Sequence, residues 1–180
     1  RSNTLGSIKF HGDLNIELPH SVQLNAPVIS ATGNPGDQVG VMAPFVQIGT
    51  ALFGSTPTGV DDASNGVSML NINAQGIDNG LLEIVGNVRL QGFESVNLNS
   101  EGDLRLRGTK QTSLDTELSG SLHSWGDLSI EADQVYATTL SQYEIAVTGD
   151  ANGVLRIDGG ESRPVLSALS ELTLSAPVIE

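Results

Sequence analysis

The residues that could carry out chemistry are few and scattered along the 180-residue chain. A glycoside hydrolase needs two carboxyl groups about 5–9.5 Å apart, and the one adjacent acidic pair is Asp61-Asp62. This pair lies among Gly, Ser, Thr and Asn without a nearby Arg or Lys, which is typical of a solvated loop. Glu83, Glu94 and Asp103 could lie on neighbouring turns of a repeat, but single outward carboxylates are common on soluble proteins.

Metal-binding and nucleophilic patterns are also weak. His11, His20 and His123 have no H-x-x-H or H-E-x-x-H spacing, and the chain has no cysteine. Asp150–Gly153 offers two oxygen ligands where Ca²⁺ takes six to eight. The many serines leave a Ser-His-Asp set open, although no G-x-S-x-G elbow occurs. We therefore expect no catalytic residue, no cofactor, no metal site and no enzyme activity.

Recognition of a carbohydrate or a protein would use exposed aromatic side chains, and aromatic residues make up 4% of the chain. Phe53 lies in a long loop, Trp125 precedes a Gly-Asp turn, and Tyr143 lies outside the predicted strands. With Asp61 and Asp62, these three residues are the candidate ligand contacts. Trp125 has a structural alternative as a lid over the end of a hydrophobic column.

Composition limits the partners that the chain can bind. The 21 acidic residues against 8 basic ones give a net charge of −13, which argues against binding nucleic acid or an anionic membrane surface. The longest uncharged run, Gln38–Val60, contains Pro and Gly and lacks the apolar character of a membrane-spanning helix. Residues 1–10 show no signal-peptide pattern and do not begin with Met, so we expect a segment excised from a longer protein.

A period-two pattern of aliphatic residues dominates the chain. Side chains alternate between the two faces of a strand, so each aliphatic–polar–aliphatic triplet predicts a short strand with one buried face. The eleven triplets are Leu14–Ile16, Val22–Leu24, Val39–Val41, Leu70–Ile72, Val88–Leu90, Val96–Leu98, Leu104–Leu106, Leu128–Ile130, Ile145–Val147, Leu155–Ile157 and Leu172–Leu174. No window has a convincing 3.6-residue period, so we expect very little helix.

The strands recur within two sequence templates. The first, apolar-x-apolar-x-Ala-Pro-x-apolar, occurs at Val22–Ile29, Val39–Val46 and Leu172–Ile179, with degenerate copies at Leu70–Ile77 and Leu128–Val135. The second, Gly-Asp-Leu-x-aliphatic, begins at Gly12, Gly102 and Gly126. In both, a turn leads into a strand, a small residue forms a corner, and another strand follows. Recurring units of this length indicate a solenoid.

The predicted solenoid is a parallel β-helix with coils of roughly 17–24 residues, or roughly seven to nine coils in all. The chain lacks the longer consensus of leucine-rich repeats and the aromatic signature of propeller blades. Inward aliphatic side chains would stack at the strand spacing of about 4.8 Å, which accounts for the low aromatic content. Unpaired N–H and C=O groups at the ends of such a rod favour end-to-end self-association.

Three stretches interrupt the strand rhythm and are expected to bulge from the rod. They lie near residues 49–66, 107–121 and 148–167, the last comprising 148–153 and 159–167. Insertions in solenoids often carry binding residues. We therefore expect a single β-helical segment over residues 1–180 with these loop insertions.

Two stretches, Gln91–Gly108 and Gly126–Tyr136, resemble the repeat region of filamentous haemagglutinin-like exoproteins. The Ala-Pro strands fit the same family, and the resemblance covers the chain from about Gly12 onward. It implies a right-handed β-helical fibre exported by Gram-negative bacteria through a dedicated outer-membrane transporter (two-partner secretion). Such fibres act in adhesion, biofilm formation or contact-dependent inhibition. No part of the chain matches the family's N-terminal secretion domain, which implies an internal or C-terminal-lying segment.

The resemblance therefore predicts a structural and adhesive segment of a secreted bacterial surface fibre. Its partners would be a host-cell or matrix glycan, a protein receptor or an exopolysaccharide. One alternative is a polysaccharide-active β-helix enzyme, and another is the passive stalk of a contact-dependent toxin-delivery protein. Convergent acidic and basic side chains in a groove would favour the enzyme, whereas a smooth polar rod would favour the fibre.

Overall fold

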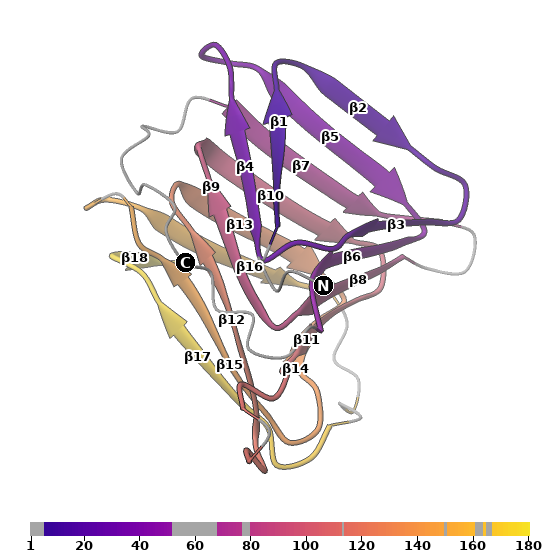
Figure 1. Cartoon of the computed structure of the whole chain (residues 1–180), viewed down its shortest axis with the longest axis vertical. Coiled ribbons are helices and arrows are strands. Elements are labelled where there is room, and N and C mark those ends of the chain that lie inside the picture. The colour runs from indigo at the N-terminus through magenta and orange to yellow at the C-terminus, as the bar shows by residue number, and fades with distance from the viewer. Residues whose placement is uncertain are drawn as a thin grey trace.

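The computed structural model describes residues 6–51, 68–76, 80–112, 114–149, 151–160, 164 and 167–180. This part of the chain contains eighteen strands and no helix, and all paired strands run parallel in three sheets (Figure 1). The sequence prediction of an all-β parallel architecture with very little helix is confirmed for these residues. None of them forms a helix long and apolar enough to cross a membrane.

The three sheets are built from strands that follow one another in rotation. Sheet 1 contains, in spatial order, β1 (Ser7–His11), β4 (Val28–Thr32), β9 (Asn87–Gln91), β12 (Leu118–Ser124), β15 (Ser141–Val147) and β17 (Glu171–Ser175). Sheet 2 contains β2 (Leu14–Glu17), β5 (Gln38–Ala43), β7 (Ser68–Ala74), β10 (Phe93–Ser100), β13 (Asp127–Ala132), β16 (Val154–Gly159) and β18 (Val178–Ile179). Sheet 3 contains β3 (Ser21–Leu24), β6 (Phe45–Gly49), β8 (Leu81–Val85), β11 (Asp103–Arg107) and β14 (Gln134–Ala137).

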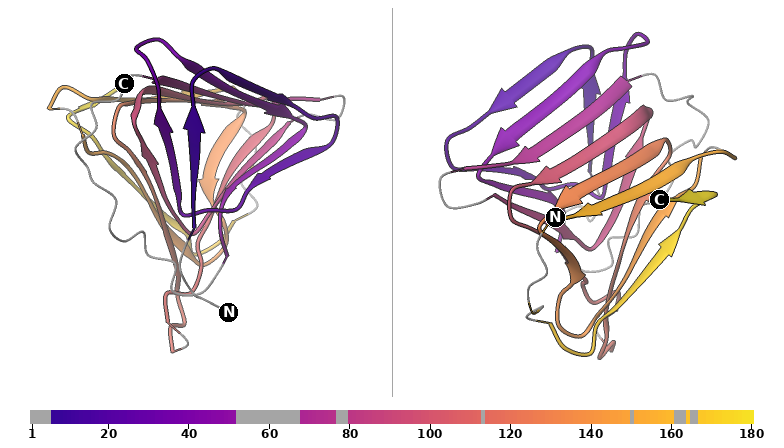
Figure 2. Two further views of the ribbon diagram at one scale, coloured as in Figure 1. Left: turned by 45° about the horizontal axis from the view of Figure 1, so that its top comes forward. Right: turned by 180° about the vertical axis from the view of Figure 1, so that it is seen from behind.

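Each round of the chain therefore places its strands beside those of the round before, around a shared core (Figure 2). The step between paired residues of successive rounds ranges from 21, where Ser7 lies beside Val28, to 36, where Phe45 lies beside Leu81, and it is 61 where β4 pairs with β9 and Val28 lies beside Arg89. Most rounds are longer than the predicted 17–24 residues, because the connections between sheets contain extra residues. Seven strands in sheet 2 agree with the lower end of the predicted number of coils.

Sheet 1 is less regular than sheet 2. Strand β4 pairs directly with β9, although β7 lies between β5 and β10 in sheet 2. Among the described residues, the round that contains β7 and β8 therefore contributes no strand to sheet 1. The predicted insertion at 49–66 falls in this round, and most of it lies outside the described residues.

The core consists of aliphatic columns that run across the sheets. In sheet 2 the inward residues of six successive strands are in register, and nearly all are fully buried beyond the first strand. The first of these columns contains Leu14, Val39, Leu70, Val96, Leu128 and Leu155. Burial of this apolar surface stabilises the fold by about 25 cal/mol per Å².

All eleven predicted triplets lie within strands. One predicted insertion is shorter than expected, because β12 begins at Leu118, inside 107–121. Strand β16 occupies Val154–Gly159, between the predicted stretches 148–153 and 159–167, and overlaps the second only at Gly159. The shortened insertion is a loop closed by paired backbone hydrogen bonds between Thr109 and Ser119, at 2.8 and 3.0 Å. It projects from the corner that follows β11 (Figure 2).

Candidate functional site

A pocket of about 200 Å³ on the outer face of sheet 1 gathers polar side chains from three successive strand ends. We call it the Trp125 pocket. Its lining residues are Arg89, Leu90, Gln91, His123, Trp125 and Thr148.

The parallel register positions these residues. Leu90 lies beside Ser124, and Ser124 lies beside Val147, all at inward positions. Because side chains alternate between faces, the residues that follow, Gln91, Trp125 and Thr148, form an outward row. The N–H of Trp125 donates to the Leu90 carbonyl at 3.1 Å, and the N–H of Thr148 donates to the Ser124 carbonyl at 3.0 Å.

A second outward row lies two residues earlier in the same strands. Arg89 of β9 is in register with His123 of β12. The Nε2 atom of His123 lies 3.3 Å from Oε2 of Glu144 on the next strand, β15. This contact holds the imidazole in place beside the pocket.

Trp125 is half-buried, and a glycine supports its ring. A Cβ atom at Gly149 would overlap the indole carbons Cγ and Cδ2. The indole therefore packs directly on the backbone at Gly149, and the absence of a side chain there leaves room for the ring. The sequence prediction of Trp125 as a candidate contact thus coincides with a pocket.

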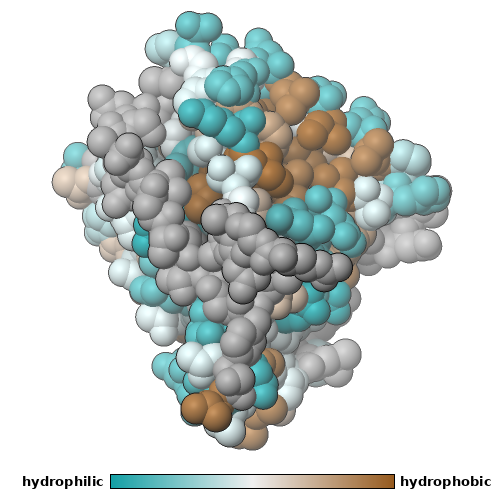
Figure 3. All heavy atoms as spheres, in the orientation of Figure 1, coloured by the Kyte–Doolittle hydropathy of each residue, from teal (hydrophilic) through white to brown (hydrophobic). Residues whose placement is uncertain are grey.

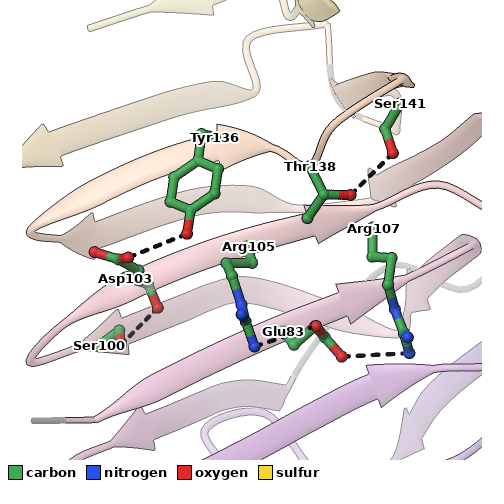
Figure 4. A network of polar contacts seen from close by, with 8 residues as sticks. All are labelled: Glu83, Ser100, Asp103, Arg105, Arg107, Tyr136, Thr138 and Ser141. Atoms are coloured by element: carbon green, nitrogen blue, oxygen red, sulfur yellow. Dashed lines mark hydrogen bonds and ion pairs between the residues drawn. The ribbon is translucent and has the colours of Figure 1, made fainter. Parts of the chain in front are cut away.

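A second group of polar residues lies on the outer face of sheet 3 (Figure 4). Glu83 of β8 contacts Arg105 at 3.4 Å and Arg107 at 3.3 Å, both on β11. Glu83 is 8% exposed, whereas the two arginine side chains are partly exposed. A buried carboxylate without such partners would be strongly destabilising, so the pairs are required by its position.

Further hydrogen bonds extend this network to neighbouring rounds. The hydroxyl of Tyr136 on β14 donates to Asp103 Oδ2 at 3.2 Å, and the Ser100 hydroxyl donates to the Gly80 carbonyl at 3.1 Å. The N–H of Gly108 donates to the Ser141 hydroxyl at 3.1 Å. The first contact joins β14 to β11 within sheet 3, and the other two connect residues next to β8 and β11 with β10 of sheet 2 and β15 of sheet 1.

The Gly-Asp-Leu template has a role that the sequence did not reveal. Asp13 Oδ1 accepts the N–H of Gln38 at 2.8 Å, and Asp127 Oδ1 accepts the N–H of Val154 at 2.9 Å. In both cases the donor is the first residue of the neighbouring strand of sheet 2. The sequence signal for this role is the Asp that follows Gly in every copy of the template.

Asparagine side chains are paired on the outer face of sheet 2. Asn97 Nδ2 donates to Asn71 Oδ1 at 2.8 Å, and Asn99 Nδ2 donates to Asn73 Oδ1 at 3.0 Å. The sequence signal is the Asn-x-Asn spacing at Asn71–Asn73 and Asn97–Asn99, which begins in the Leu70 and Val96 triplets. This spacing did not enter the sequence predictions. These pairs add register-specific contacts outside the core.

The prediction that Tyr143 is an exposed ligand contact is wrong. Tyr143 lies in β15, is 2% exposed, and donates its hydroxyl hydrogen to the Gly86 carbonyl at 2.9 Å. Burial raises the pKa of this hydroxyl well above its usual value. Its ring fits because the neighbouring strand has Gly120 in register, where a Cβ atom would overlap the ring.

The other predicted contacts, Phe53, Asp61 and Asp62, lie outside the described residues. Within the described ranges, no group of three or more His, Asp and Glu side chains is placed to hold a metal ion. Comparison with known proteins found no matching family model, no matching curated protein and no matching solved structure.

Proposed function

We propose that the chain is a structural and adhesive segment of a secreted bacterial surface fibre, folded as a right-handed parallel β-helix. The observation that carries this proposal is the rotation of the chain through three parallel sheets, with aliphatic columns in register from round to round. An architecture in which each round contacts only its neighbours extends by adding rounds, which suits a fibre. Right-handed winding follows the strong preference of parallel β-connections, right-handed in about 98% of cases.

The outer surface supports a soluble rod. Outward strand positions of sheet 2 carry polar side chains such as Asn71, Asn97 and Ser129, which lie side by side. The net charge of −13 discourages lateral sticking between copies. A rod of this kind can present surface for adhesion while remaining dispersed.

The outermost strands of the chain support end-to-end self-association. Leu14 and Leu18 are exposed near the first strands, and Leu174, Val178 and Ile179 are exposed on the last ones. Hydrophobic side chains gather on the face that overlies β1, β2 and β5 (Figure 3). Apolar column ends beside unpaired strand edges favour stacking of one copy on another.

The proposed location is the bacterial cell surface, after export of the parent protein through an outer-membrane transporter. Its support is the sequence resemblance, together with strands that stack in chain order within each sheet, so that the rounds can form one after another. The absence of cysteine means that this chain needs no oxidative step to fold. The proposed partners are a host-cell or matrix glycan, a protein receptor or an exopolysaccharide.

The geometry gives less support to a polysaccharide-active enzyme. In the described part of the chain, the residues that line the Trp125 pocket include no Asp or Glu, whereas glycoside hydrolysis uses a pair of carboxyl groups. A passive stalk of a toxin-delivery protein shares the proposed fold and differs only in lacking adhesion. An adhesion measurement therefore separates the fibre segment from the stalk.

The test uses beads coated with the purified chain, applied to epithelial cells and to biofilm matrix. The matched control is the same beads after heat unfolding of the bound chain. We expect adhesion by the folded chain alone. Equal retention of both bead types on every surface would contradict the adhesive role, and a crystal structure with left-handed winding would contradict the proposed fold.

A further inference from the structure

We propose that the Trp125 pocket binds the carboxylated sugar ring of an acidic glycan. This inference rests on the proposed adhesive function and names the class of ligand at one site. It draws on the charge, the ring and the size of the pocket.

The charge of the lining is opposite to that of the chain. Among the described residues, Arg89 and His123 line the pocket and no acidic residue does, although acidic residues outnumber basic ones by 21 to 8 in the whole chain. A guanidinium group presents a planar fork of N–H donors that matches a carboxylate. The pocket is therefore suited to a ligand that carries a carboxylate.

Trp125 supplies an apolar surface for a ring. The indole is fixed by its packing on Gly149, so it is preorganised before any ligand arrives. Ligand pockets typically combine aromatic side chains with a few placed polar groups, and this pocket adds the Thr148 hydroxyl and the Gln91 amide. Hydroxyl and amide groups can both donate to and accept from sugar hydroxyls.

The volume limits the ligand to one ring. About 200 Å³ lies below the roughly 300–1,000 Å³ of sites for drug-sized ligands. Arg89 and Gln91 already have interaction partners within the chain. A guanidinium has five N–H donors and a Gln amide has four hydrogen-bonding positions, so one existing contact leaves capacity for a ligand.

The basic residues of sheet 3 are a poorer site for the same ligand. Glu83 contacts both Arg105 and Arg107 and neutralises much of their charge. The Trp125 pocket adds an indole ring to its basic residues, and Glu144, which contacts His123, lies outside its lining. These features favour the Trp125 pocket.

The chain has a single tryptophan, so its intrinsic fluorescence reports this pocket directly. The folded chain is titrated with trigalacturonate, with N-acetylneuraminic acid and, as the neutral comparison, with maltotriose. We expect a saturable fluorescence change with at least one of the two acidic sugars and at least tenfold weaker binding of maltotriose. Preference for trigalacturonate indicates a polysaccharide source, and preference for N-acetylneuraminic acid indicates a sialylated host glycan.

Two arginine substitutions provide a matched pair. Arg89→Gln removes the charge at the pocket, and Arg156→Gln removes one charge from the exposed Arg156–Asp158 pair in β16 of sheet 2. We expect Arg89→Gln to weaken binding of the acidic sugar at least tenfold, as for loss of a hydrogen bond to a charged group. Arg156→Gln should leave the affinity unchanged.

Gly149→Ala gives an independent variant that retains every charged group. The added Cβ atom displaces the indole, so we expect a shifted emission maximum and weaker binding. Circular dichroism establishes that each variant is folded. For a folded Arg89→Gln chain, unchanged affinity would overturn the inference; if that variant does not fold, Gly149→Ala decides in the same way.

Three further results would overturn the inference: no saturable change with either acidic sugar, equal binding of maltotriose, or equal losses in both arginine variants. Each of these would leave the proposed function intact if coated beads still adhere. Failure of bead adhesion to every surface would instead contradict the proposed function.

Discussion

Sheets 1 and 2 differ in regularity, although the same chain builds both in alternation. In sheet 2, Val96 lies between Leu70 and Leu128 in an uninterrupted aliphatic column. In sheet 1, the column that contains Leu90 continues to Ser124, whose buried hydroxyl has no hydrogen-bond partner in the described part of the chain. Sheet 2 has uninterrupted aliphatic columns, whereas sheet 1 contains the Trp125 pocket.

In and next to sheet 1, glycine residues make room for aromatic rings. Small residues on one strand make room for a ring from the next, as Gly120 does for Tyr143 and Gly149 does for Trp125. In both cases the ring and the glycine come from adjacent rounds. At these two positions, an aromatic ring is accommodated where a neighbouring residue has no side chain.

The largest expected effect comes from the regular sheet. Leu98→Ala truncates a fully buried residue between Ile72 and Ile130, and neighbouring rounds cannot collapse into the space. We expect a loss of about 2–5 kcal/mol in the free energy of unfolding, measured by urea denaturation. The same truncation at Leu174, which is exposed on β17, should cost less than half as much. Equal losses would remove the distinction between the interior and the edge of the columns.

Gly120→Ala tests the packing of the tyrosine ring in sheet 1. The added Cβ atom would overlap Tyr143 and approach the Gly86 carbonyl oxygen at 2.8 Å. We expect a loss of about 1–3 kcal/mol in thermal or urea unfolding, typical of overpacking. Adding Tyr143→Leu should recover part of that loss. Strictly additive effects of the two changes would argue against contact between these residues.

Burial of the Tyr143 hydroxyl also predicts how the free energy of unfolding depends on pH. Its pKa is raised in the folded chain, so the folded state retains a proton that the unfolded state releases above about pH 10. The stability contributed by this group is complete below pH 10 and falls above it, by about 1.4 kcal/mol per pH unit. We expect Tyr143→Phe to have a shallower decline between pH 10 and 11 in urea unfolding. Parallel curves for the two proteins would contradict burial of the hydroxyl.

The smallest expected effect on the free energy of unfolding is a gain rather than a loss. Ser124→Ala removes a buried hydroxyl that has no partner among the described residues, and it leaves the strand unchanged. We expect a gain of about 1 kcal/mol in the free energy of unfolding. Thr148→Ala, an exposed neighbour, is the control and should change stability little. A loss on Ser124→Ala would show that the hydroxyl is satisfied.

The regular part of the fold could be predicted from the sequence because its inward positions are all aliphatic. Strand β12 could not, since its inward positions are Gly120, Leu122 and Ser124, which show no hydrophobic alternation. Tyr143 was misread for a related reason. The Ile145–Val147 triplet extends back in steps of two to Tyr143, but the ring was not counted as part of the strand.

The pocket could be predicted only in part. Trp125 was a candidate from its residue type and its position before a Gly-Asp turn, whereas Arg89 and His123 were not assigned to a shared site. These two residues are in register although 34 positions separate them, which is longer than the predicted coil. Since the connections vary in length, the sequence alone could not determine which outward residues lie side by side.

The register of successive rounds is the central claim, and the cysteine-free chain allows a direct test by disulfide crosslinking. Asn71 and Asn97 are paired outward residues in adjacent strands, and the strand spacing of about 4.8 Å suits a disulfide. The control pair is Asn71 with Ser129, which lies one strand further away, at about 10 Å. We predict rapid oxidation of the Asn71→Cys/Asn97→Cys variant and none within the Asn71→Cys/Ser129→Cys monomer. Crosslinking of the control pair, or failure of the first, would contradict the stacked parallel rounds.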